Sequence, residues 1–160
     1  MAREIERKFL VATDGWKDMV LYSQELRDGL ILANDGRKLR VRIQDDRALL
    51  TVKGARDGIV RDEFEYPIPM SDAQEMLDKL CGDELVEKTR HHVKAGDMVW
   101  TVDVYRGLLA GIIIAEIELP EVDHDFPIPS WVGREVTGLQ EYRKVNLAAA
   151  RRNGVFTRTG

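Results

Sequence analysis

Charged residues recur at alternate positions in several segments of this sequence, and both members of each pair have the same sign. In chain order the pairs are Glu4 and Glu6, Arg40 and Arg42, Glu63 and Glu65, Lys88 and Arg90, and Glu116 and Glu118. Residues two apart on a β-strand share one face, where like charges repel unless something between them compensates. Any fold of this chain must therefore supply that compensation.

The first of these segments can be interpreted in two ways. On a strand, Glu4, Glu6 and Lys8 share one face and the residues between them face the other way. On a helix, Glu4 and Lys8 would form an ordinary surface ion pair four residues apart. The run Phe9-Leu10-Val11 that follows favours a strand. The recurrence of the same alternation along the chain favours it too.

Length and composition indicate one globular domain, which we expect over residues 1–154 with a loose tail over 155–160. Hydrophobic residues make up 44% and charged residues 32%, which excludes a disordered chain. The net charge of −4 excludes an overall basic, nucleic-acid-binding protein, so any anion site must be a local concentration of Lys and Arg. A single cysteine, Cys81, excludes an intramolecular disulfide and a cysteine-rich zinc site. With no signal-peptide pattern and no apolar run of about 20 residues, we expect a soluble cytoplasmic protein.

Alternation and turn signals predict about eight strands with hairpin spacing. Asn34-Asp35-Gly36 is a strong hairpin signal, and Ala95-Gly96-Asp97 is a second turn. Gly29 interrupts the second strand and suggests a bulge.

Two helices are expected beside the strands. The clearer one spans Ser71 to Leu80, with Ser71 and Gln74 as a capping box and Gly82 just past the end. The other spans residues 142–152 and is stopped by Asn153-Gly154. The three tryptophans are expected to pack in the core or its shell.

Regular strands of this kind build either a sandwich or a barrel. The charged faces could be the solvated outer faces of a sandwich. They could also point into a wide barrel, and segregation of the charges by sign from strand to strand favours this interpretation. A barrel of about eight strands can enclose one small ligand. Acidic and basic walls would suit a polyanion bound with a metal ion, because carboxylates hold hard cations while Lys and Arg hold phosphate oxygens.

The segment Glu4-Ile5-Glu6-Arg7-Lys8 resembles the ExExK signature of the CYTH domain, also called the triphosphate tunnel metalloenzyme superfamily. The later charged positions follow in the order of that family, namely Arg40-x-Arg42, Lys53, Glu63-x-Glu65, Lys88-x-Arg90, Asp103 and Glu116-x-Glu118. The resemblance covers roughly residues 2 to 150 and is strongest to the small bacterial members. It implies a closed, eight-stranded antiparallel barrel, or tunnel, that hydrolyses inorganic triphosphate with Mg²⁺ or Mn²⁺. One departure is Leu30, where the small bacterial members often carry a tyrosine.

Residue by residue, the resemblance and the charge pattern imply two sets of ligands. The expected metal ligands are Glu4, Glu6, Glu116 and Glu118, with Asp103 as a ligand or its support and Glu63 and Glu65 holding a second metal or orienting cations. The expected triphosphate ligands are Lys8, Arg40, Arg42, Lys53, Lys88 and Arg90. Either Lys53 or Lys88 could act as general acid or base if neighbouring cations depress its pKa. The expected partner is a small-molecule triphosphate, with no stable nucleic-acid or membrane binding and a homodimer as a possible assembly.

Two other functions stay open at this point. The first is a related enzyme acting on an organic triphosphate, such as a class IV adenylate cyclase or a thiamine or nucleoside triphosphatase. The second is a non-catalytic binder of polyphosphate or nucleotide, although a pure anion binder gains little from so many acids. A histidine metal site is not expected, because His91 and His92 adjoin a hairpin turn on opposite faces and His124 is isolated.

Overall fold

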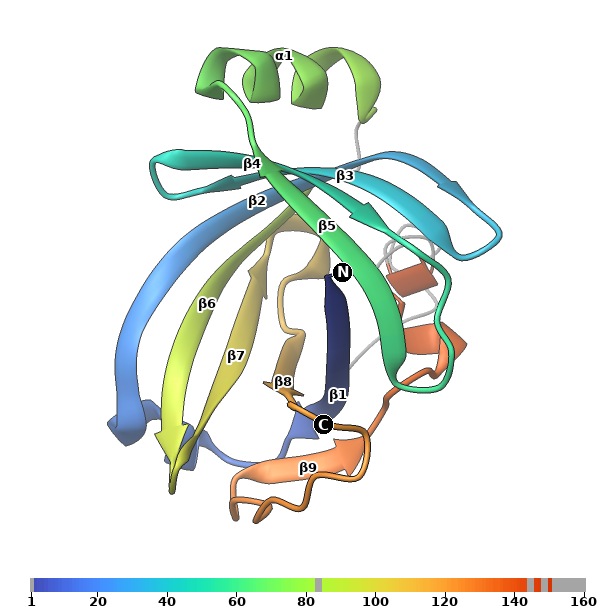
Figure 1. The fold of residues 1–160 in the computed structure, drawn as a ribbon. Helices are drawn as coiled ribbons and strands as arrows, with labels where there is room; N and C mark the ends of the chain where they lie inside the picture. The colour runs from blue at the N-terminus through green and yellow to red at the C-terminus, as the bar shows by residue number, and fades with distance from the viewer. Residues whose placement is uncertain (1, 83–84, 144–145, 148–149, 151–160) are drawn as a thin grey trace.

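A computed structural model describes residues 2–82, 85–143, 146–147 and 150 of the chain. In this part of the chain, nine strands form one antiparallel sheet, accompanied by one α-helix and three short 3-10 helices. Figure 1 shows the sheet curled into a barrel with the α-helix lying across one side. No helix among the described residues is long and apolar enough to cross a membrane.

Most strands follow one another as hairpins, so neighbours in sequence are mostly neighbours in the sheet. The strands are β1 (Arg3–Val11), β2 (Val20–Asn34), β3 (Arg37–Gln44), β4 (Arg47–Lys53), β5 (Val60–Pro67), β6 (Val86–Ala95), β7 (Met98–Arg106), β8 (Ile113–Glu118) and β9 (Val132–Glu135). The helices are α1 (Met70–Leu80) and the 3-10 helices η1 (Asp14–Met19), η2 (Gly107–Leu109) and η3 (Gln140–Tyr142).

Eight of the strands close into a barrel, which confirms the predicted fold. The pairing order is β5-β4-β3-β2-β6-β7-β8-β1, and β1 pairs back onto β5, with Glu4 opposite Arg61 at the seam. The ninth strand, β9, lies against the end of β1 at Phe9 and Val11. The sequence did not predict β9, because four residues are too few for an alternation to show.

The main hydrophobic core lies against the outer face of the barrel. Trp100 and Val102 of β7 and Ile117 of β8 belong to it and are almost completely buried. Trp16 of η1 and Trp131, just before β9, cover this face, and the Trp100 and Trp131 rings meet edge to face with centroids 5.6 Å apart. The tryptophans therefore pack as predicted, and alternation leaves the charged faces of the same strands for the interior.

A second apolar cluster fills one end of the interior. Leu10, Tyr105 and Ile114 continue the inward faces of β1, β7 and β8, and they pack with Val136 and Leu147. Charged residues are thereby confined to the rest of the barrel.

Helix α1 packs on the outer face of the sheet, and Gly29 of β2 lies beneath it. A Cβ atom at Gly29 would come within 2.5 Å of Leu77 Cδ2 and 2.7 Å of Cys81 Sγ. Gly29 therefore permits a close approach of the helix, whereas the predicted irregularity of β2 falls between Leu30 and Leu32. Cys81 is buried just past the end of α1.

The start of α1 differs from the prediction. The helix begins at Met70 after Pro69, and no side chain caps it. The predicted capping box is wrong because Ser71 already lies in the first turn, where Ala73 N donates to Pro69 O at 3.1 Å. Gly82 adopts a left-handed conformation just past the helix, as predicted.

The second predicted helix, over residues 142–152, lies only partly within the described residues. Tyr142 ends the 3-10 helix η3 rather than beginning an α-helix. Residues 144–145, 148–149 and 151–160, which include the predicted tail, lie outside the described residues.

Replacing Gly29 by alanine tests the close packing of α1 on β2. We expect the free energy of unfolding to fall by about 1–3 kcal/mol, because the added methyl group overpacks the contact with Leu77 and Cys81. Urea denaturation would measure the change. Leu32→Ala serves as the control on the same strand, since Leu32 is 66% exposed. A Gly29→Ala protein as stable as the parent would show that the helix has room to move.

Candidate active site

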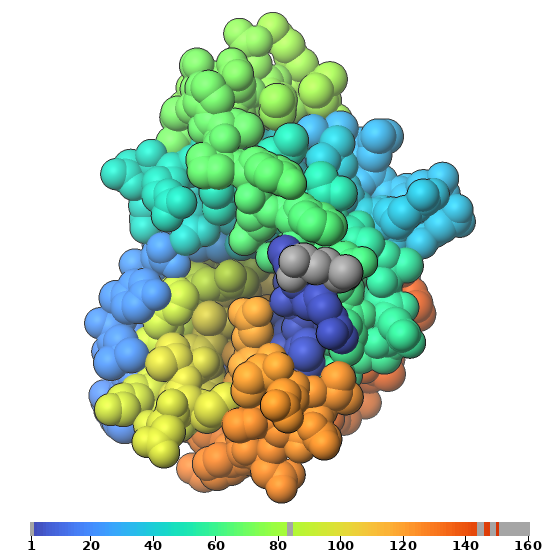
Figure 2. Space-filling model, viewed as in Figure 1, coloured from blue at the N-terminus to red at the C-terminus, as the bar shows by residue number. Residues whose placement is uncertain are grey.

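A cavity of about 340 Å³ lies within the barrel and is lined mainly by charged side chains. Every barrel strand except β2 contributes to it. Figure 2 shows the hollowed face between β5 and β7. The carboxylates are Glu4, Glu6, Glu63, Glu65, Glu116 and Glu118, and the cations are Lys8, Arg40, Arg42, Lys53 and Arg90. The structure thus brings together all the predicted site residues except Lys88 and Asp103, which line neither this cavity nor the larger one beside it.

The acids of β1 and β8 lie side by side. Glu6 is paired in register with Glu118, and Lys8 with Glu116. Burial raises the pKa of Glu4, Glu6 and Glu118 above the ordinary value of a glutamate, and repulsion from neighbouring carboxylates adds to the effect. Negative charge is therefore costly here, and a bound cation would reduce that cost.

Lysines of the protein lie between these acids. Lys8 Nζ is 3.6 Å from Glu6 Oε1 and 3.6 Å from Glu116 Oε1. Burial alone would lower the pKa of Lys8, but the attraction of Glu116 and Glu6 raises it overall. Lys53 Nζ is 3.2 Å from Glu4 Oε2. Both lysines are thus ion-paired with carboxylates that could also serve a metal ion.

The acids have the chemistry of a metal site but are spread apart by these cations. Among the described residues, no three carboxylate or imidazole groups come close enough together to hold a metal ion as they stand. Carboxylate oxygens are nevertheless the ligands that Mg²⁺ and Mn²⁺ prefer. Arg42 and Arg90 are already paired with acids outside this lining, so the carboxylates outnumber the remaining cations. The donor set therefore fits a divalent cation.

Two acids of β5 orient cations. Glu63 Oε2 is 3.0 Å from Lys53 Nζ. Glu65 Oε2 is 3.9 Å from Arg40 Nη2, which also donates to Thr51 Oγ1 at 3.3 Å. These contacts place Glu63 and Glu65 beside Lys53 and Arg40, two of the expected triphosphate ligands.

Arg42 is fixed by an acid that the sequence analysis missed. Its Nε and Nη2 atoms donate to the two carboxylate oxygens of Asp28 at 2.7 and 2.8 Å, and both side chains are almost fully buried. Although burial alone would raise it, the pKa of Asp28 is well below its usual range because Arg42 and Arg40 are close. Asp28 gave no signal because it is a single acid in a segment without charge alternation.

Lys88 and Asp103 form a buried support for Arg90. Lys88 Nζ is 2.7 Å from Asp103 Oδ2, and Arg90 Nε and Nη2 donate to the same carboxylate at 2.8 Å each. Burial lowers the pKa of Lys88 despite this carboxylate, and Lys88 and Arg90 hold the pKa of Asp103 below its usual range. Both Asp103 oxygens are thus engaged by protein cations.

A histidine that lines the cavity and an arginine beside the cavity were not predicted, although the histidine could have been. His92 follows Lys88 and Arg90 at the same spacing of two and lines the cavity, where Gln24 Oε1 lies 2.8 Å from its Nε2 atom. Arg56 lies between β4 and β5, and its Nη2 atom donates to Glu6 at 3.3 Å. A loop residue such as Arg56 has no periodicity that sequence analysis could use.

Comparison with known proteins agrees with this architecture. The model of the CYTH domain matches residues 2–152. A protein of Acetivibrio thermocellus named inorganic triphosphatase is 43% identical over 150 residues, which cover 92% of this chain and 94% of that protein. The crystal structure of the inorganic triphosphatase NE1496 superimposes with a TM-score of 0.66 at 31% identity, covering 97% of this chain and 99% of the other.

A more distant structure extends the likeness of the fold. The PH1819 protein of Pyrococcus horikoshii OT3 has a TM-score of 0.62 at 20% identity, covering 96% of this chain and 100% of the other. The charged barrel interior, the order of its residues and the match to the family model agree with one another. The chain belongs to the CYTH domain family.

Proposed function

We propose that this protein hydrolyses inorganic triphosphate to pyrophosphate and phosphate with the help of Mg²⁺ or Mn²⁺. The observation that carries the proposal is the cavity inside the barrel, where carboxylates and cations line one small space. A triphosphate and a divalent cation together present the complementary charges. The related inorganic triphosphatases support the choice of substrate.

The basic residues would bind the phosphate oxygens. Arg42 and Arg90 are held in fixed orientations by Asp28 and Asp103, so their guanidinium groups need little rearrangement when substrate arrives. Preorganised donors of this kind stabilise the charge that develops on a transferring phosphoryl group. Lys88 would act indirectly, by fixing Asp103.

The acidic residues would hold the metal. Glu4, Glu6, Glu116 and Glu118 supply its oxygen ligands, and a divalent cation bound there would polarise the phosphate and lower the pKa of a bound water. As Lys8 and Lys53 turn from these carboxylates toward the phosphates, oxygen atoms of the acids become available. Lys53, which lines the cavity, is better placed than Lys88 to donate a proton to the leaving group.

The size and charge of the site favour a small-molecule substrate over a nucleic acid. The cavity has a volume of about 340 Å³ and lies inside a closed barrel. The net charge of the chain is −4, so its surface as a whole would not attract a nucleic acid. We also propose that the protein acts in the cytoplasm, where small phosphorylated molecules are found.

Product analysis tests the proposed reaction. With Mg²⁺ or Mn²⁺, the purified protein should release phosphate from inorganic triphosphate faster than from ATP, because the charged lining binds phosphates rather than a nucleoside. Phosphate, pyrophosphate and cyclic nucleotide would be measured after incubation with each substrate. Cyclic AMP with pyrophosphate as the main products from ATP would replace the proposal with a cyclase, and binding without turnover would indicate a non-catalytic binder.

Glu118→Gln should raise the metal concentration needed for half-maximal activity, and excess metal should restore part of the rate. The substitution is nearly isosteric and removes mainly a charge. Because the pKa values of Glu4, Glu6 and Glu118 are raised, protons compete with the metal, so the parent should need less metal at pH 8 than at pH 6. Metal titrations at both pH values would measure this.

The matched control for Glu118→Gln is Glu75→Gln, which removes a carboxylate from the exposed face of α1. It should leave the metal titration unchanged. If Glu118→Gln also leaves the titration unchanged, Glu118 is not a metal ligand.

Arg40→Gln should lower kcat/KM for triphosphate about tenfold to a hundredfold, and excess metal should not restore it, because the lost contact is to phosphate. Arg40 is a better target than Arg42 or Lys88. Truncating Arg42 would take both hydrogen bonds from the buried Asp28, at a cost of about 3–5 kcal/mol in stability, and truncating Lys88 would remove one of the two cations that hold the buried Asp103. Arg37→Gln is the control on the same strand, and full activity of a folded Arg40→Gln protein would refute the phosphate contact.

A further inference from the structure

A second cavity, of about 510 Å³, adjoins the acid-lined one inside the barrel. Lys8, Arg40 and Lys53 line both cavities and therefore mark the boundary between them. The second cavity differs sharply in charge: the one carboxylate in its described lining is Asp28, which is already paired with Arg42. We call this second cavity the basic chamber.

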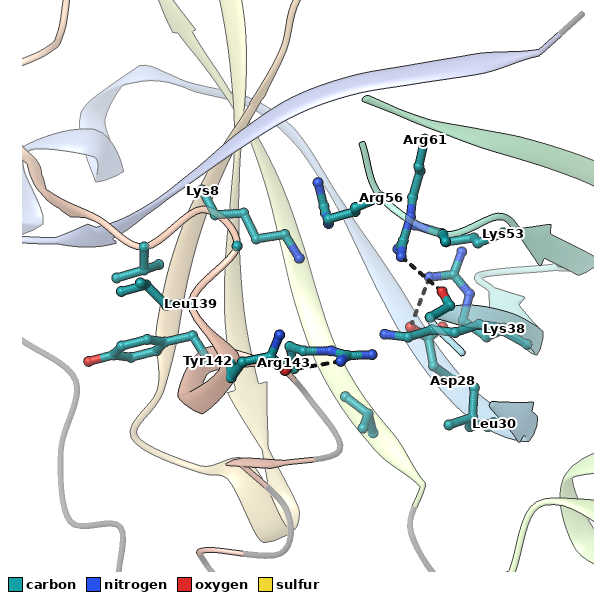
Figure 3. Close-up of a pocket in the computed structure, with 18 of the residues that line it drawn as sticks. Lys8, Asp28, Leu30, Lys38, Lys53, Arg56, Arg61, Leu139, Tyr142 and Arg143 are labelled. Atoms are coloured by element: carbon teal, nitrogen blue, oxygen red, sulfur yellow. Dashed lines mark hydrogen bonds and ion pairs between the residues drawn. The ribbon is translucent and has the colours of Figure 1, made fainter. Parts of the chain in front are cut away.

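Among the described residues, four further cations line the basic chamber alone. Lys38 comes from β3, Arg61 from β5, Arg56 from the segment between β4 and β5, and Arg143 from the residues after η3. In Figure 3 the amino and guanidinium groups of Lys8, Lys38, Arg61 and Arg143 surround one central space. Cations of β1, β3 and β5, together with Arg143 after η3, thus direct positive charge at the same space.

Most of these cations lack an acidic partner. Within the described part of the chain, Lys38, Arg61 and Arg143 form no ion pair with a carboxylate. Arg61 is only 7% exposed, donates to Gly36 O at 3.4 Å, and has no partner for its Nε atom. A buried donor without an acceptor is costly, and a bound anion would supply the acceptor.

The closely spaced positive charges lower the pKa values of two of these cations. Burial, together with the repulsion of Arg143 and Arg61, lowers the pKa of Lys38 to about 7. Burial and Arg56 also lower the pKa of Arg61. The apolar side chains of Leu30, Val86 and Leu139 line the same chamber, and such a wall limits screening by water.

We propose that the basic chamber binds a second phosphate-type anion, orthophosphate or pyrophosphate, while triphosphate occupies the acid-lined cavity. A compact anion with several oxygens can accept from donors on all sides at once, as the placement of Lys38, Arg61 and Arg143 requires. Among the described residues, the chamber has no free carboxylate to hold a metal, so the proposed ligand is the bare anion. The proposed function enters only in assigning triphosphate to the other cavity.

If the protein is a triphosphatase, a product that leaves the acid-lined cavity would reach the adjoining basic chamber. An anion released from the acid-lined cavity can pass Lys8, Arg40 and Lys53 and remain bound beyond them. Pyrophosphate should then inhibit hydrolysis without simple competition against triphosphate, because the two anions occupy different cavities.

Calorimetry on metal-free protein tests the site without any need for turnover. Pyrophosphate and orthophosphate would be titrated separately, which shows which of the two the chamber prefers. Lys38→Gln and Arg61→Gln should each weaken binding about tenfold to a hundredfold, as expected for the loss of one charge-assisted contact. Arg37→Gln, which removes an exposed cation from the same strand as Lys38, should leave the affinity unchanged.

A pH series with sulfate, whose charge is constant between pH 6 and 8, adds a second readout. The parent should bind sulfate more tightly at pH 6, where Lys38 is protonated, and Lys38→Arg should keep the affinity while losing most of its pH dependence. The charged groups that face Lys38 from the surrounding elements are Lys8, Asp28, Arg40, Lys53, Arg61 and Arg143.

The proposal fails if folded Lys38→Gln and Arg61→Gln proteins bind both phosphate anions as tightly as the parent, or if Arg37→Gln weakens binding equally. Thermal melting would confirm that each variant is folded, which is expected because each substitution relieves repulsion. If the parent protein binds the anions but does not hydrolyse triphosphate, the proposed function is refuted while the proposed anion site in the basic chamber is not.

Discussion

Rows of like charge inside a closed barrel can exist only because other strands supply the opposite charge, and the rest of the structure depends on this compensation. Lys8 lies between the carboxylates of two adjacent strands, at 3.6 Å from both Glu6 and Glu116. Arg42 is held by Asp28 in the same way. Each row would be repulsive alone. Closure of the barrel between β1 and β5 turns these rows into a network of alternating sign.

An interior of this kind displaces the hydrophobic core. Strands alternate faces, so a charged inner face obliges the apolar side chains to point outward, where they need cover. Trp16 and Trp131 cover one part of the wall, and Leu77 of α1 covers another. Gly29 lets α1 approach β2 closely and so helps to provide this cover. Packing on the outside thus holds the barrel in the shape that keeps the charged rows together.

The period of two in the sequence identified the faces but not the depth of each residue. This alternation predicted that Arg40, Glu116 and other paired charges face one interior, and the structure brings these two residues to the same cavity. It did not show that Lys88 is fully buried, because alternation says nothing of what packs above a side chain. It also missed Arg56, whose loop has no period. Partners such as these depend on which strands become neighbours, which the sequence pattern alone does not determine.

The two cavities differ in charge, so the barrel interior is electrostatically asymmetric. Carboxylates gather in one, cations that mostly lack an acidic partner among the described residues gather in the other, and Lys8, Arg40 and Lys53 lie between them. A metal ion is attracted to the first and repelled by the second, so a metal-bound anion has one favourable place along this path. A bare anion has the opposite preference. Separating metal from anion therefore shifts the favoured position toward the basic chamber, and hydrolysis, which divides the charge of the substrate between two products, would lead to that separation.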